Sequence, residues 1–228
     1  MKPAVSQVLN EMRALGRAEV NDGRARFGIL ATAAFGLTTP QIRTIGRRLG
    51  KNQALAEELW ETGVHEARIL ASLVGDPAAI RPATMDRWAR DFQSWDVCDA
   101  CSYNLFDRTP KAWFQVARFA KSEREFVRRA AFAMIAGLAM HDKAAPDQAF
   151  VDAFPLIERH AFDNRNFVRK AVNWGLRGIG KRNAGLRPAA LECAARIRQQ
   201  DTPSARWIAA GALRELRARG GKEVPPEC

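Results

Sequence analysis

A tryptophan and an aspartate at helical spacing are the residues of this sequence best suited to chemistry. In the segment 94–101 (SWDVCDAC), Trp95 and Asp99 are four residues apart, so on a helix they share one face. An indole ring stacks on a nucleoside or attracts a cation, and a carboxylate stabilises developing positive charge. The pair therefore predicts a site for a cationic or nucleoside-like group. The alternative is that Trp95 packs in the core and Asp96 caps the helix.

A second face combines an aromatic ring with cations in the segment 167–177. Lys170, Trp174 and Arg177 are separated by four and three residues, so they also share one side of a helix. Large aromatic residues at helical spacing usually pack. Packing therefore stays open as an alternative to ligand binding for both Trp95 and Trp174. The remaining tryptophans are interpreted as packing residues: Trp60, Trp88, Trp113 and Trp207.

Other patterns that carry chemistry are missing. Cys98 and Cys101 form a C-x-x-C pair, but no second pair or histidine cluster follows at the spacing of zinc ligands, so we predict no metal and interpret both as small apolar helix residues. His65, His141 and His160 lack Ser, Cys or Asp partners at a recognisable spacing, so we expect structural or surface roles. The sequence has no P-loop, dinucleotide fingerprint, H-E-x-x-H or G-x-S-x-G motif. We predict no cofactor.

The charge of the chain points to an anionic partner. The formal net charge is +11, and eight of the 36 basic residues are lysines, so the remaining 28 are arginines. Neutralising phosphates releases counterions, which favours nucleic acid over anionic membranes or acidic proteins as the partner. The sequence has no signal peptide and no run of about 18 apolar residues. We therefore expect a cytoplasmic protein with no membrane partner, whose four cysteines stay reduced.

The apolar residues recur at spacings of three and four, which predicts an all-α chain. We expect a single domain over residues 1–228, with a flexible tail at about 219–228. The predicted helices span residues 3–17, 24–37, 40–49, 53–61, 65–74, 82–91, 95–107, 110–120, 124–140, 147–160, 165–181, 186–199 and 203–218.

A short pattern of an arginine among small apolar residues recurs along the chain. Its arginines are Arg68, Arg128, Arg169 and Arg206, at intervals of 60, 41 and 37 residues. The last two intervals are near the period of HEAT-type helix pairs. We therefore predict a curved α-solenoid of antiparallel helix pairs, whose concave face is basic where such arginines line it. The alternative is that these arginines are solvated or form salt bridges.

The ordered motifs of the chain resemble one known family. The segments that carry the resemblance are 25–27 (ARF), 35–43 (FGLTTPQIR), 58–60 (ELW), 65–68 (HEAR), 94–99 (SWDVCD), 129–131 (RAA) and 170–177 (KAVNWGLR). In this order on a basic all-α chain, they are similar to the DNA alkylation repair enzymes of the AlkD type, which are HEAT-like-repeat DNA glycosylases. The resemblance spans most of the chain.

The resemblance implies excision of purines alkylated at N3 or N7, such as 3-methyladenine and 7-methylguanine, from double-stranded DNA. Such a base is already cationic and leaves as a neutral molecule, so the main task is to stabilise an oxocarbenium-like sugar. Asp99 matches the catalytic aspartate of the family. Trp95 and Trp174 match the two tryptophans that cradle the lesion nucleotide. Arg129, and not its neighbour Arg128, matches the arginine that holds a backbone phosphate.

The resemblance also implies that the base is removed without flipping into a pocket. The matched motif offers no amine nucleophile for a Schiff base, so we predict a monofunctional glycosylase that leaves an abasic site, with Lys170 as the nucleophile in the alternative of a bifunctional enzyme. The further residues expected on DNA are Phe27, Lys170 and Arg177. Phe27 stands where some family members have tyrosine, which keeps a stacking surface and removes a hydroxyl. The segment 141–148 lengthens the interval between Arg129 and Trp174. We expect a monomer without an obligate protein partner.

Two other functions compete with this prediction. A HEAT-like solenoid with basic residues can bind branched or distorted DNA without catalysis, through shape and charge. A solenoid that binds proteins would explain the repeats but not the net charge or the Trp95 and Asp99 pair. The presence of Trp95, Asp99, Arg129 and Trp174 favours the glycosylase.

Overall fold

The computed structural model describes residues 4–29, 31 and 33–220, and every regular element in this part of the chain is helical. The chain divides into two compact units, Met1–Lys111 and Ala112–Cys228, each with its own buried core. A single domain over residues 1–228 stays a prediction. Of the expected tail, residues 219 and 220 belong to the last helix, and residues 221–228 lie outside the described part.

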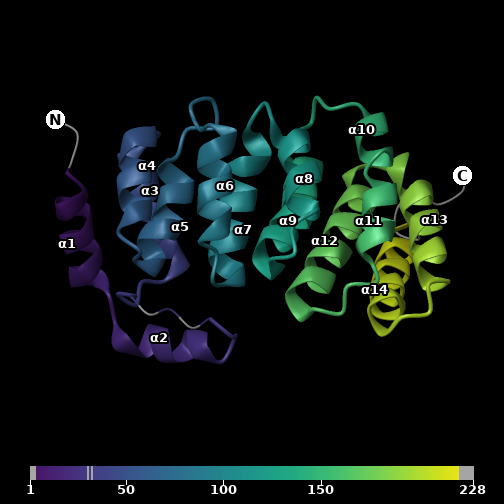
Figure 1. The fold of residues 1–228 in the computed structure, drawn as a ribbon, viewed down its shortest axis with the longest axis horizontal. Coiled ribbons are helices and arrows are strands. Elements are labelled where there is room, and N and C mark those ends of the chain that lie inside the picture. Colours follow the sequence, from purple (N-terminus) through teal and green to yellow (C-terminus); the bar gives the residue numbers. More distant parts are fainter. Residues whose placement is uncertain (1–3, 30, 32, 221–228) are drawn as a thin grey trace, which may run out of the picture. The chain divides into compact units, whose positions relative to one another are not determined.

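The first unit consists of short helices that pack mainly on α5. Its elements are α1 (Val5–Leu15), α2 (Ala18–Ala25), α3 (Thr39–Leu49), α4 (Gln53–Glu61), α5 (His65–Val74), α6 (Pro82–Arg90), α7 (Trp95–Asn104) and the short 3-10 helix η1 (Phe106–Arg108). Helices α3, α4 and α7 all pack against α5, and α2 lies across the lower ends of this row (Figure 1). The rings of Trp60 and Trp88 stack in the core with centroids 4.3 Å apart, which confirms that both are packing residues.

The second unit is built around two long helices. Its elements are α8 (Ala112–Ala120), α9 (Glu125–His141), α10 (Asp147–Val151), α11 (Phe154–His160), α12 (Asn166–Arg182), α13 (Leu186–Arg198) and α14 (Pro203–Gly220). Helix α9 packs between α8 and α12, and α12 also contacts α13 and α14, as Figure 1 shows. Helix α9 is buried at every residue from 127 to 139, and these residues are small or apolar except for Arg128 and Arg129. This burial fixes α12 on one side of α9 and α8 on the other.

Two predicted helices differ from the structure. The described residues 26–29, 31 and 33–38 are not helical, because Gly28 and Gly36 adopt positive φ angles of 73° and 85°, and a Cβ atom at Gly36 would lie 1.9 Å from the Arg17 carbonyl oxygen. The predicted helix over 147–160 is two helices, α10 and α11. The break falls before Pro155, whose ring has no N–H to donate to the preceding turn.

The four arginines of the recurring pattern all have partners inside their own unit. The guanidinium of Arg68 lies 5.1 Å from the Trp60 ring centroid, and that of Arg169 lies 5.2 Å from the Trp207 ring centroid. Arg206 forms an ion pair with Asp201, and Arg128 pairs with Asp163. These contacts favour the interpretation that the pattern holds helices together. A basic concave face stays a prediction.

Asp163 lies at the centre of a buried ion-pair network between α11 and α12. Its carboxylate accepts hydrogen bonds from Arg128 at 2.8 Å and from the Arg165 guanidinium at 2.5 Å and 2.9 Å. Burial alone would raise the pKa of Asp163, but the hydrogen bonds from Arg165 and Arg128 outweigh it and lower the pKa to about 2. The network also occupies Arg128, which the sequence analysis excludes from DNA contact.

The lowered pKa of Asp163 predicts how acid affects the stability of the protein. Its ordinary pKa is 3.8, and each unit of lowering corresponds to about 1.4 kcal/mol, so Asp163 contributes about 2.5 kcal/mol above pH 4. This contribution should disappear as the pH falls from about 4 to about 2. Urea unfolding of the wild type and of Asp163→Asn across this range measures it. Equal pH slopes for the two proteins would contradict the assignment.

The two cysteines of the C-x-x-C pair lie in the core of the first unit. Cys98 and Cys101 are buried on α7, and neither takes part in a disulfide, as expected for apolar packing residues. Burial raises the pKa of the Cys101 thiol well above its ordinary value.

Within the described residues, no group of three or more His, Cys, Asp or Glu side chains is arranged to hold a metal ion. None of the described helices has the length and apolar character needed to cross a membrane.

Candidate functional site

Helix α7 presents the predicted reactive pair. Ser94 is the N-cap residue, Trp95 is the first helical residue, and Asp99 follows one turn later. The buried side of the helix consists of Val97, Cys98, Cys101 and Ser102. Trp95 and Asp99 are half-buried and lie on a different side. Their spacing therefore brings an indole and a carboxylate together at the surface of the first unit, as the sequence predicts.

The indole of Trp95 is held by the chain segment that carries Phe27. Its Nε1–H donates to the Phe27 carbonyl oxygen at 3.0 Å. Phe27 is 69% exposed, so the segment that holds Trp95 also carries an accessible aromatic residue. The structure thus joins two residues, 68 positions apart, that the sequence analysis assigns to DNA contact. The bond leaves the indole with a fixed orientation and no indole hydrogen for another acceptor.

The start of α7 is fixed by a histidine on the neighbouring helix. His65 Nε2 lies 2.7 Å from Asp96 Oδ2, while the Ser94 hydroxyl donates to Asp96 Oδ1 at 2.6 Å. Burial alone would raise the pKa of Asp96, but these interactions with His65 and Ser94 lower it. The expected structural role of His65 is confirmed. Ser94, and not Asp96, occupies the cap position, and Asp96 instead ties α7 to α5.

The next residue on α5, Glu66, anchors the segment that follows Phe27. Glu66 is fully buried and accepts hydrogen bonds from the backbone N–H groups of residues 35, 36 and 37 at 3.0, 2.7 and 3.1 Å. Arg24 forms an ion pair with it at 2.5 Å. Burial alone would raise the pKa of Glu66, but its hydrogen bonds, that from Arg24 above all, lower it. His65 therefore holds the start of α7, and Glu66 holds the segment that follows Phe27.

The second unit holds the other predicted residues. Arg129 is 6% exposed and donates to the Phe167 carbonyl oxygen at 2.6 Å. On α12, Trp174 is half-buried and Lys170 is exposed. Arg177 forms an ion pair with Glu215 on α14. The predicted grouping of Lys170, Trp174 and Arg177 on one helix is therefore present, but Arg177 already has an anionic partner.

A basic cavity in the first unit contains residues that the sequence analysis did not assign to the site. It encloses about 410 Å³ and is lined by Arg43, Gly46, Arg47, Gly50, Lys51, Leu73 and Asn104. Arg47 donates to the Thr44 hydroxyl at 3.3 Å, and Lys51 donates to the Leu73 carbonyl oxygen at 2.9 Å. Burial and the charge of Arg108 lower the pKa of Lys51. Arg43 and Arg47 are four residues apart on α3, and this spacing is the signal that predicts two cations on one helix face. Lys51 follows the end of α3 and has no such signal.

Trp207 corrects one sequence prediction. It is 44% exposed and lines a cavity on α14, so the interpretation of Trp207 as a packing residue was wrong. Trp113 is a packing residue, since its ring contacts Phe150 edge-on with centroids 5.4 Å apart. His160 is buried against Phe132, with ring centroids 5.5 Å apart.

The all-helical fold and these residues define the class of protein. The chain belongs to the DNA alkylation repair enzyme family, whose model matches residues 8–216. A solved structure with the same fold comes from "a new family of proteins related to the HEAT-like repeat DNA glycosylases with affinity for branched DNA structures". The two chains are 20% identical, with a TM-score of 0.78 over 96% of this chain and 95% of that one. No curated protein matches the sequence. The predicted HEAT-like helical fold is confirmed.

Proposed function

We propose that this protein is a monofunctional DNA glycosylase that removes cationic N3- or N7-alkylated purines from double-stranded DNA. The observation that carries the proposal is the pairing of Trp95 with Asp99 on the surface of α7, in a chain that belongs to the DNA alkylation repair enzyme family. A carboxylate next to an aromatic ring suits a reaction in which positive charge moves from base to sugar.

The proposed reaction needs little beyond that charge stabilisation. The bond between C1′ and the alkylated purine breaks, and its electron pair neutralises the base, which leaves. Positive charge then develops on the sugar, where the carboxylate of Asp99 stabilises it. Water adds to C1′ and loses a proton, and the strand keeps an abasic site. No amine is required, so the exposed Lys170 is proposed as a DNA contact and not as a nucleophile.

The remaining residues are proposed to bind the DNA around the lesion. Trp95 and Trp174 contact the lesion nucleotide and favour its cationic form through their ring faces. Arg129 holds a backbone phosphate with a planar guanidinium. Phe27 supplies a further stacking surface. Arg177 can bind a phosphate when the phosphate takes the place of Glu215 as its anionic partner.

The basic cavity on α3 extends the proposed DNA contact and gives a separate prediction. Each cation that neutralises a phosphate contributes about one to the slope of log affinity against log salt concentration. Replacing Arg43 and Arg47 with alanine should therefore make the slope shallower by about two. Fluorescence anisotropy with a duplex at several salt concentrations measures this. Arg48→Ala is the matched control, because Arg48 is on the same helix but pairs with Glu11. An unchanged slope in the double variant would contradict the phosphate contact.

The proposed function is tested by incubating the purified protein with methylated duplex DNA and separating the released bases by chromatography. Free 3-methyladenine or 7-methylguanine, with the strand left intact until alkali is added, is the expected result. Borohydride treatment should trap no covalent protein–DNA adduct, since no Schiff base forms.

One observation favours a second candidate, a noncatalytic protein that binds branched DNA. The solved structure with the same fold belongs to a family with affinity for branched DNA structures. Tight binding of a four-way junction without release of any methylated base would support this second function and contradict the first.

A further inference from the structure

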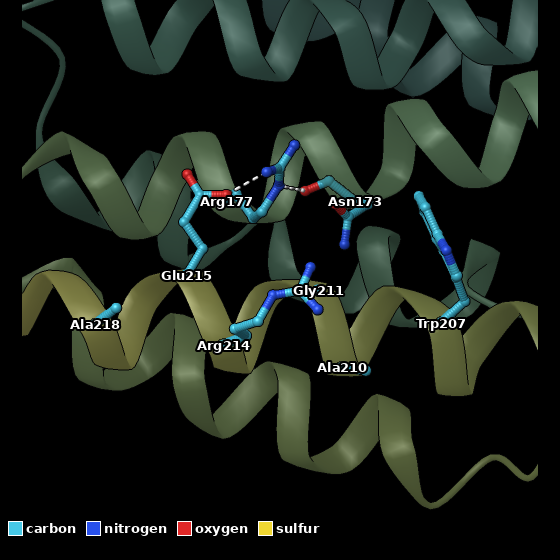
Figure 2. Close-up of a pocket in the computed structure, with 8 residues that line it drawn as sticks. All are labelled: Asn173, Arg177, Trp207, Ala210, Gly211, Arg214, Glu215 and Ala218. Atoms are coloured by element: carbon cyan, nitrogen blue, oxygen red, sulfur yellow. Dashed lines mark hydrogen bonds and ion pairs between the residues drawn. The ribbon is translucent and has the colours of Figure 1, made fainter.

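The cavity lined by Trp207 shares Arg177 with the proposed DNA contact, but Trp207 and Arg214 have no part in the proposed reaction. It lies in the second unit between α12 and α14, encloses about 480 Å³, and is lined by Asn173, Arg177, Trp207, Ala210, Gly211, Arg214, Glu215 and Ala218. Figure 2 shows Trp207 at one end and the pair of Arg177 and Glu215 towards the other. A volume of this size is within the range of small-ligand sites.

The aromatic wall of the cavity is accessible and oriented. Trp207 is 44% exposed, and the guanidinium of Arg169 lies 5.2 Å from its ring centroid. Arg169 is outside the set of residues that line the cavity, so it supports the ring without filling the space in front of it. An exposed indole held in this way is a platform on which a planar ring can stack.

The charge of the cavity is positive. Arg177 forms an ion pair with Glu215, and Lys181 also pairs with Glu215 at 2.9 Å, so these two cations share one carboxylate. Arg214 is exposed and forms no ion pair with the described residues. Its side chain extends along α14 towards Gly211 and Asn173 (Figure 2). It is therefore available to an anion that enters the cavity.

Small residues keep the floor of the cavity open. Ala210 and Gly211 lie between Trp207 and Arg214 on α14. A Cβ atom at Gly211 would lie 3.1 Å from Asn173 Nδ2, so glycine allows α12 and α14 to approach closely here. Asn173 is held by its own hydrogen bond from Nδ2 to the Ile208 carbonyl oxygen at 2.8 Å. Asn173 is thus held in place, and the Trp207 ring and the Arg214 guanidinium lie along the same short stretch of α14.

We propose that this cavity binds an unpaired nucleotide of a DNA strand, with the base stacked on Trp207 and a phosphate on Arg214. This inference rests on the proposed DNA binding of the protein. An indole stacks on any base, because every base has a π face, but a base that is paired and stacked within a duplex does not present that face. The combination of an exposed ring with an available guanidinium therefore selects a single-stranded or branched region over an intact duplex.

The test compares a forked duplex with a blunt duplex of the same sequence, the fork carrying 2-aminopurine in its single-stranded arm. Trp207→Ala should weaken binding to the fork about tenfold and change binding to the blunt duplex less than twofold. Stacking on Trp207 should also quench the fluorescence of 2-aminopurine. Trp207→Phe, which keeps an aromatic face, should retain most of the affinity for the fork. Arg214→Glu, a change at an exposed position, should weaken fork binding selectively.

Matched controls are available in the same unit. Phe114 is 55% exposed, and the Arg118 guanidinium lies 5.6 Å from its ring centroid, so Phe114→Ala removes a similar ring outside the cavity. Arg198→Glu reverses the charge of an exposed residue on α13, as Arg214→Glu does on α14. Both controls should leave fork binding unchanged. Equal losses on fork and blunt duplex in Trp207→Ala and Arg214→Glu, or no loss at all, would overturn the inference. Wild-type protein that binds neither DNA would refute the proposed function itself.

Discussion

Asp99→Asn should slow the release of alkylated purines by about 10²- to 10³-fold, which is the effect of removing one group that stabilises transition-state charge. The amide keeps the shape of the side chain but has no negative charge to place near the sugar. Affinity for undamaged duplex should change little, because the substitution removes no cation. Single-turnover excision from methylated DNA and anisotropy with the same duplex measure the two quantities.

A comparison variant separates this effect from a general change in charge. Asp22 is an exposed aspartate on α2 in the same unit, and Asp22→Asn raises the net charge by the same amount. It should leave the excision rate within about twofold, because surface substitutions away from special features have small effects. If Asp99→Asn retained the wild-type rate, the proposed role of Asp99 would be wrong.

Glu66→Gln should lower the free energy of unfolding by about 3–5 kcal/mol, the typical cost of breaking a buried ion pair. The buried Glu66 carboxylate accepts from Arg24 and from the backbone N–H groups of residues 35–37. An amide presents one acceptor oxygen and points its own N–H groups at donors, so the guanidinium loses its counterion. Urea unfolding at neutral pH, followed by circular dichroism, measures the change.

Glu57→Gln provides the matched control for Glu66. Glu57 is a partly exposed glutamate on α4, 3.7 Å from Arg87 in an exposed ion pair. Surface pairs of this kind contribute about 0–1 kcal/mol, so this variant should unfold almost as the wild type does. The pKa of Glu66 is lowered in the folded protein, so its stabilisation is present at neutral pH and is lost in acid. Equal midpoints for both variants would show that the Glu66 network does not hold the segment.

Local patterns were sufficient to predict much of the fold. The helices over 53–61 and 65–74 match α4 and α5 residue by residue, because their apolar spacing and end signals agree. The shared face of Trp95 and Asp99 also follows from spacing alone. The helix predicted over 24–37 was wrong after residue 25, because two glycines at positive φ and hydrogen bonds to the Glu66 carboxylate determine the backbone conformation of that segment.

Contacts between distant residues could not be predicted in the same way. His65 and Asp96 are 31 residues apart, and Phe27 and Trp95 are 68 apart, so neither pair has a spacing signal. Trp207 was predicted to pack because large aromatic residues at helical spacing usually do, but the small residues that follow it leave its ring at an open cavity. The tertiary packing of α12 on α14 decides its exposure.

The proposed function requires that the protein itself cleaves the glycosidic bond of alkylated purines. The most direct measurement is the amount of free 3-methyladenine and 7-methylguanine released from methylated duplex DNA by the wild type and by Asp99→Asn at equal salt. We expect release by the wild type and a rate lower by about 10²-fold or more in the variant. The absence of released base from both proteins, with tight DNA binding by both, would show that the protein is not a glycosylase.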